Sequence, residues 1–160
     1  MDFFDLIRQG KVEAVVAAIS DSPNLISDKD KKGFPPLILA SYSDQFEITK
    51  LLLEKGADVN ALDVAGNTAL MGVSFKGYTK IAELLIQKGA EIDIQNLNGA
   101  TALIYAATFG RIEIAKLLVT SGADKTIKDK RGNTAFMHAE FQGVPAVSYT
   151  HMTLPTTPYV

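Results

Sequence analysis

Apolar residues recur at helical spacing along much of the chain. Ile81, Leu84 and Leu85 occupy positions i, i+3 and i+4, and the same pattern returns 33 residues later from Ile114. Residues at this spacing share one face of an α-helix. The pattern therefore predicts short amphipathic helices, each burying one face against a neighbour.

Threonine and glycine residues mark where the predicted helices begin and end. Thr68, Thr101 and Thr134 each precede an alanine, and a threonine N-cap satisfies free backbone N–H groups of a first turn, contributing about 1 kcal/mol. In an earlier copy Pro36 occupies the first-turn position, where no N–H group is needed. A glycine after each second helix, such as Gly89, is a typical left-handed terminator. Each unit is therefore a turn followed by two short helices.

The 33-residue spacing indicates a repeat protein, because self-similarity at one fixed period is the signature of a solenoid. The turn glycines that define the period are Gly33, Gly66, Gly99 and Gly132. We divide the single domain 1–146 into units at about 1–29, 30–62, 63–95, 96–128 and a truncated 129–146. The first unit has predicted helices near Phe3–Gln9 and Val12–Ser20. Its polar residues suit the N-terminal cap that a solenoid needs.

Two motifs in these units resemble the ankyrin repeat family. Gly99–Ala107 reads Gly-Ala-Thr-Ala-Leu-Ile-Tyr-Ala-Ala, close to the family's Gly-x-Thr-Pro-Leu-His-x-Ala-Ala, and Leu52–Asn60 matches its Leu-Leu-x-x-Gly-Ala-Asp-Val-Asn signature. The resemblance covers residues 1–146. It implies an all-α ankyrin-repeat solenoid of the bacterial type, in which helix-turn-helix units joined by β-turn loops are stacked. The signature histidine is replaced by Ile38, Met71, Ile104 and Met137, which we expect to leave the architecture unchanged.

The resemblance also implies where a partner would bind. Members of the family hold partner proteins with the turn tips and the concave face of the first helices. Carried onto this sequence, the partner-binding residues are Lys31, Lys32, Phe34, Tyr42, Val64, Ala65, Asn67, Phe75, Lys76, Leu97, Asn98, Thr108, Phe109, Lys130, Arg131, Asn133 and Phe141.

An aromatic residue recurs near the end of each predicted first helix in these units. The four are Tyr42, Phe75, Phe109 and Phe141. They form either a row of anchors along the groove, since aromatic residues dominate protein interfaces, or packing between neighbouring helices that closes the core. Both interpretations stay open.

One helical position raises a separate packing question. Gly72 stands inside a predicted helix, where glycine costs about 1 kcal/mol relative to alanine. We expect Tyr105 of the next unit to lean into the space beside it.

Residues suited to catalysis or metal binding are scarce. The chain has no cysteine and two histidines, His138 and His151, which excludes thiolate and multi-histidine sites. The repeat places no serine or carboxylate to orient His138, so we expect this residue to have a structural role. With 16 basic and 18 acidic residues the formal net charge is −2, and this balance argues against a nucleic-acid or anionic-membrane surface.

The composition changes abruptly near the C-terminal end. Residues 144–160 contain no charged residue, although the repeat predicts a second helix starting near Pro145. Residues from about 147 to 160 resemble the translation of a sequencing-library adapter, and we interpret them as a non-native or disordered tail. The alternative is a genuine irregular extension.

Together these features predict a non-catalytic protein–protein interaction module without cofactor or metal. The first residues lack the pattern of a secretory signal, and no apolar run approaches the roughly 20 residues needed to span a membrane. We therefore expect a cytoplasmic monomer. The alternatives are a small-molecule-binding or enzymatic protein that uses the concave groove, and a fragment of a larger multidomain ankyrin protein.

Overall fold

Helices form all the regular elements in the part of the chain that the computed structural model describes, residues 1–143. The expected all-α fold is therefore confirmed. The predicted end of the truncated last unit near residue 146 and the tail at 147–160 lie outside the described residues. The helices are α1 (Phe3–Arg8), α2 (Val12–Asp21), the 3-10 helix η1 (Pro23–Ser27), α3 (Pro36–Tyr42), α4 (Phe46–Glu54), α5 (Ala69–Lys76), α6 (Thr79–Gln87), α7 (Ala102–Thr108), α8 (Ile112–Thr120) and α9 (Ala135–Gln142).

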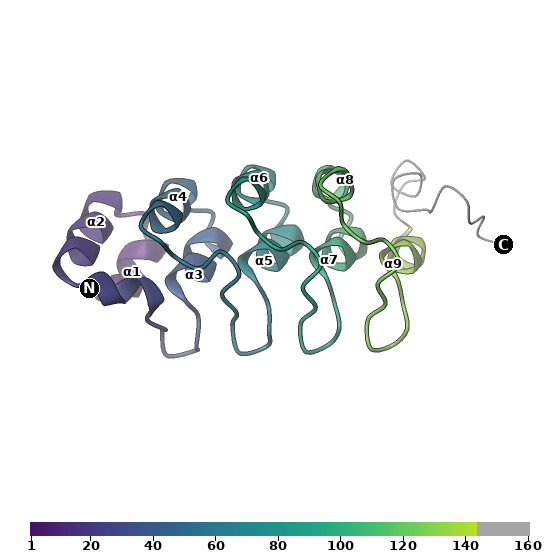
Figure 1. Ribbon diagram of the computed structural model, residues 1–160, viewed down its shortest axis with the longest axis horizontal. Coiled ribbons are helices and arrows are strands. Elements are labelled where there is room, and N and C mark those ends of the chain that lie inside the picture. The colour runs from purple at the N-terminus through teal and green to yellow at the C-terminus, as the bar shows by residue number, and fades with distance from the viewer. Residues whose placement is uncertain (144–160) are drawn as a thin grey trace.

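The helices lie in two parallel rows (Figure 1). The first helix of each unit contacts the first helix of the next, from α1 and α3 through to α9, and α2, α4, α6 and α8 form the second row in the same way. Long loops project beyond the first-helix row between successive units (Figure 1). This is the predicted stack of helical hairpins.

The predicted N-caps are confirmed at three helices. The side-chain oxygen of Thr68 accepts the Met71 N–H at 3.2 Å and begins α5. Thr101 and Thr134 make the same bond at the start of α7 and α9. Helix α3 instead begins with Pro36, which needs no N–H partner there.

The predicted left-handed glycines after the second helices are also present. Gly89 follows α6 with φ 91° and Gly122 follows α8 with φ 100°. Because L-residues seldom adopt this conformation, glycine ends these helices at little cost.

The hydrophobic core runs between the two helix rows. Leu70 of α5 and Leu103 of α7 are buried from the first row. Leu85 of α6 and Leu118 of α8 are buried from the second, with no exposed surface. Since every unit contributes to one continuous core, each helix pair shelters the apolar face of the next.

The N-terminal unit agrees with the predicted helices and adds one element. Helices α1 and α2 lie within one residue of their expected bounds, but η1 was not predicted. Phe3 and Ile7 of α1 are buried against the core. Arg8 forms an ion pair with Asp30, Nη2 to Oδ2 at 3.2 Å, which ties this unit to the first turn.

Neighbouring turns are joined by backbone hydrogen bonds. The Leu97 N–H donates to the Ala65 carbonyl at 3.0 Å, and the Lys130 N–H donates to the Asn98 carbonyl at 3.1 Å. Gly99 makes this approach feasible, because its φ is 76° and a Cβ atom there would lie 2.9 Å from the Lys130 nitrogen. The turns therefore stack in register with the helices.

Candidate partner-binding face

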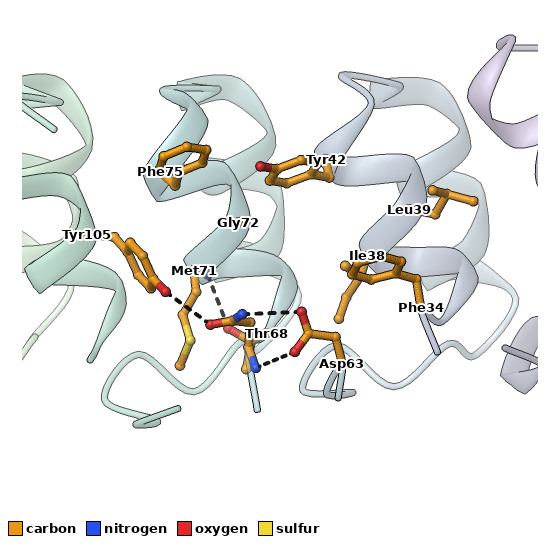
Figure 2. A pocket seen from close by; sticks show the side chains of 11 residues that line it. Phe34, Ile38, Leu39, Tyr42, Asp63, Thr68, Met71, Gly72, Phe75 and Tyr105 are labelled. Atoms are coloured by element: carbon orange, nitrogen blue, oxygen red, sulfur yellow. Dashed lines mark hydrogen bonds between the residues drawn. The ribbon is translucent and has the colours of Figure 1, made fainter. Parts of the chain in front are cut away.

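A pocket of about 410 Å³ lies among the first helices α3, α5 and α7 and the turns that precede α3 and α5 (Figure 2). We call the surface formed by α3, α5, α7, α9 and their preceding turns the first-helix face. The pocket's apolar and aromatic residues are Phe34, Ile38, Leu39, Tyr42, Met71, Phe75 and Tyr105, and its polar residues are Asp63, Asn67 and Thr68. A cavity of this size with few polar groups is typical of a binding site.

The aromatic residues near the helix ends lie at the surface and contact one another. Tyr42 and Phe75 are stacked, with ring centres 6.3 Å apart and planes at 5°, and Phe75 meets Phe109 edge-on at 4.7 Å. Tyr42 is 42% exposed and Phe109 46%. The rings therefore lie outside the buried core and form a continuous surface from α3 to α7.

Two residues modify the predicted aromatic row. Tyr105, absent from the predicted set, packs against Phe75 at 6.4 Å and against Phe109 at 6.5 Å. Phe141 is 68% exposed, and its ring meets that of His138 at 6.3 Å. The aromatic cluster is therefore centred on Phe75.

The expectation that Tyr105 fills the space beside Gly72 is wrong. A Cβ atom added to Gly72 would lie 3.1 Å from Cδ1 of Tyr42, and no atom of Tyr105 lies within 4 Å of it. Tyr105 does face α5, but it borders the pocket at a greater distance (Figure 2). The space beside Gly72 is occupied by the ring of Tyr42, from the preceding unit, and not by that of Tyr105, from the following unit.

A hydrogen-bonded chain connects the polar end of the pocket to the next unit. The Asn67 side-chain amide donates to Oδ2 of Asp63 at 3.2 Å. The Asn96 amide donates to Oδ1 of Asn67 at 2.8 Å and to the Tyr105 hydroxyl at 3.0 Å. Asn67 is thus fixed in position by groups on both sides. The sequence does not indicate these hydrogen bonds, because the central one joins Asn96 to Asn67 in the preceding unit.

His138 has a carboxylate partner, contrary to the expectation that none orients it. Its Nε2 lies 2.7 Å from Oδ2 of Asp129, and since a carboxylate only accepts, the imidazole N–H donates. Burial raises the pKa of Asp129, but hydrogen bonds from the Asn133 N–H, His138 and the Arg131 N–H outweigh it, so this pKa lies below its ordinary value. The hydrogen bond between His138 and Asp129 links α9 to the turn that precedes it.

The tip residues implied by the family resemblance lie at the surface. Val64 is 73% exposed and Leu97 64%. The other tip residues, Lys31, Lys32, Ala65, Asn98, Lys130 and Arg131, are exposed as well. Phe34 and Asn67, by contrast, lie further in and line the pocket.

Three other residues that the family resemblance assigns to partner binding already contact groups within the chain. The Thr108 hydroxyl donates to the Ile104 carbonyl at 2.7 Å, and the Asn133 backbone N–H donates to the turn carboxylate of its own unit. The Lys76 ammonium lies 4.9 Å from the centre of the Tyr42 ring, a cation–π contact. The Thr108 hydroxyl is therefore less available to a partner than its position suggested.

Within residues 1–143, no three or more histidine, aspartate or glutamate side chains are grouped closely enough to hold a metal ion. In the same part of the chain, no helix combines the length and the apolar character needed to cross a membrane.

The stacked helical hairpins, the capped first helices and the linked turns define a helical-repeat solenoid. A family model described as ankyrin repeats in three copies matches residues 70–149, half of the chain, and a second ankyrin-repeat model matches residues 39–86. The chain belongs to the ankyrin repeat family. Ankyrin repeats generally serve as non-enzymatic domains that bind other proteins.

Curated relatives share only part of their length with this chain. Ankyrin repeat and SAM domain-containing protein 6 of Rattus norvegicus is 37% identical over 44% of this chain and 8% of its own length. The DNA-binding protein RFXANK of Homo sapiens is 34% identical over 44% of this chain and 27% of its own length. The palmitoyltransferase akr1 of Aspergillus oryzae is 35% identical over 38% of this chain and 8% of its own length. The chain therefore matches less than a third of the length of each.

Proposed function

We propose that this chain is a non-catalytic module that binds a partner protein on its first-helix face. The observation that carries the proposal is the aromatic cluster beside the pocket, in which the exposed Tyr42 and Phe109 contact the half-buried Phe75. A contiguous apolar patch at the surface of a folded protein marks an interaction site. Aromatic residues are also the side chains that contribute most to protein interfaces.

The rigid stack favours binding further. Caps, buried leucines and linked turns hold the first-helix face in one conformation, so little conformational entropy is lost on association. The formal charge of −2 favours a protein partner over a nucleic acid, whose phosphates attract basic surfaces. We also propose that the module acts as a monomer in the cytoplasm.

The composition of the pocket favours binding over catalysis. Asp63 is the single carboxylate among its lining residues, and His138 is not one of them. General acid–base chemistry needs titratable groups that converge on one substrate. The pocket offers mainly aromatic and aliphatic walls, which suit recognition of a side chain.

Selection from a displayed peptide library, followed by comparison of variants, tests the proposal. Phe75→Ala and Phe109→Ala change the aromatic cluster. Phe46→Ala is the matched control, because Phe46 is 36% exposed on α4 in the second row. We expect each substitution in the aromatic cluster to weaken the binding of the selected peptides by at least about 2 kcal/mol, the loss typical of an interface anchor.

The control variant is expected to bind as the unchanged chain does. Circular dichroism and urea unfolding of all three variants separate a lost contact from lost folding. Peptides that bind both cluster variants as tightly as the unchanged chain would rule out the first-helix face as the binding site.

A further inference from the structure

The turns of the four complete or partial repeats after the N-terminal unit carry one equivalent polar residue each. These residues are Asp30, Asp63, Asn96 and Asp129, spaced 33 apart. In all four, Oδ1 accepts the backbone N–H groups two and four residues further on, at 2.8–3.0 Å. This atom shapes the turn, and the second side-chain atom is left for another partner.

Three of the four second atoms have a partner that reaches the turn from a helix. Asp30 Oδ2 pairs with the Arg8 guanidinium at 3.2 Å. The Asn96 amide donates to the Tyr105 hydroxyl, and Asp129 Oδ2 accepts from His138 at 2.7 Å. In the last two units the partner stands nine residues after the turn residue.

Asp63 lacks the equivalent partner because the residue nine positions further on is Gly72. Within residues 1–143, its Oδ2 accepts only from the neutral Asn67 amide at 3.2 Å, and Asp63 forms no ion pair. The missing side chain at position 72 leaves the pocket open above this carboxylate. Asp63 is thus a negatively charged group at the end of an aromatic pocket.

The pocket's walls suit a planar cation. Tyr42, Phe75 and Tyr105 present rings around it (Figure 2), and guanidinium groups both stack on aromatic rings and form directed hydrogen bonds to carboxylates. Tyr42 already attracts one cation, since the Lys76 ammonium lies 4.9 Å from its ring centre.

We propose that the pocket holds an arginine side chain of the partner, a refinement that rests on the proposed function. The guanidinium donates to Oδ2 of Asp63 and stacks among the rings of Tyr42, Phe75 and Tyr105. The partner thereby supplies the donor group that the chain itself provides to the other two turn aspartates, Asp30 from Arg8 and Asp129 from His138. A segment with a basic residue also complements the chain's net negative charge.

Titration by NMR with small probes tests this assignment. The probe is N-acetyl-arginine N-methylamide, and the citrulline analogue is the neutral control of nearly equal shape. We expect the arginine probe to shift backbone signals around Gly72 and to bind at least about tenfold more tightly than the citrulline probe, the ratio expected from one charge-assisted hydrogen bond.

Asp63→Asn should abolish that difference. The variant keeps the turn, because Asn96 makes the same backbone bonds at the equivalent position. Glu83→Gln, an exposed change on α6, controls for the loss of one negative charge and should leave the difference intact.

Three results would each overturn the arginine assignment. They are equal binding of the two probes, an unchanged difference between the probes in Asp63→Asn, and tighter binding of a third probe, N-acetyl-lysine N-methylamide, than of the arginine probe. Results that overturn the arginine assignment can be distinguished from results that overturn the proposed function. If library peptides still depend on Phe75 and Phe109 while the arginine probe does not bind, only the arginine assignment is wrong. If the peptides bind equally well without those rings, the proposal that a partner binds on the first-helix face is wrong.

Discussion

Gly72 of α5 lies against the edge of the Tyr42 ring from the preceding unit, so that a Cβ atom at Gly72 would stand 3.1 Å from Tyr42 Cδ1. This contact shapes the pocket in two ways. The glycine leaves space above Asp63, and the ring covers the helix backbone from one side. The first-helix face therefore depends on a residue with no side chain.

Replacing Gly72 with alanine is expected to stabilise the fold. Alanine is favoured over glycine in a helix by about 1 kcal/mol. The opposing cost is a shift of a few tenths of an ångström by the Tyr42 ring, and Tyr42 is 42% exposed. We predict that Gly72→Ala raises the free energy of unfolding by roughly 0.5–1 kcal/mol in urea titration.

Gly110→Ala is the matched comparison for that prediction. Its added methyl group would meet no atom within 4 Å, but its φ is 68°, where alanine is strained. This variant should lower the free energy of unfolding. A destabilised Gly72→Ala protein would show that the Tyr42 ring is held rigidly in place.

The N-cap of α7 offers a second test of the repeat's local energetics. In Thr101→Ala the Ile104 N–H loses its side-chain acceptor in a buried position. The free energy of unfolding should fall by about 1 kcal/mol. Thr120→Ala is the control, because this exposed hydroxyl only donates to carbonyls within its own helix. Equal effects of the two substitutions would contradict the capping role.

Acid should weaken the attachment of α9 to its turn. The pKa of Asp129 in the folded chain lies below its ordinary value of 3.8, because hydrogen bonds to the carboxylate outweigh the effect of burial. The unfolded chain therefore binds a proton at higher pH than the folded chain. The stability contributed by Asp129 is present above the unfolded pKa and is lost as the pH falls through the folded pKa.

Urea unfolding followed between about pH 5 and about pH 3 measures this loss. Asp129→Asn should make the free energy of unfolding less dependent on pH in that range. The exposed change Asp21→Asn on α2 is the control for removing one carboxylate. A pH dependence that is unchanged in Asp129→Asn would show that Asp129 does not contribute in this way.

Features set by residues a few positions apart could be predicted from the sequence. Thr68 as a cap, Pro36 in a first turn and Gly89 after a helix each follow from interactions with residues a few positions away. The period of 33 residues then extends them to every unit. Their agreement with the structure reflects the local nature of capping.

Contacts between units could not be predicted in the same way. Whether Tyr42 or Tyr105 lies over Gly72 depends on the direction in which neighbouring helices are offset, and the repeat alone does not specify it. The bond between His138 and Asp129 lies within one unit, but the capping and turn signals do not indicate it either, because it forms only when the turn folds back onto the helix that follows it. The polar end of the pocket depends on a bond within one unit, from Asn67 to Asp63, and on a bond between two units, from Asn96 to Asn67. The repeat pattern therefore does not predict it.

Binding on the first-helix face is tested most sharply by mapping a bound peptide on the chain with isotope-labelled methyl groups. Ile38 and Met71 line the pocket, whereas Ile86 lies on α6 in the second row. On addition of a library-selected peptide, we expect saturable shifts of the Ile38 and Met71 methyl signals and none of the Ile86 signal. Shifts confined to Ile86 and its neighbours on the second row would contradict this expectation.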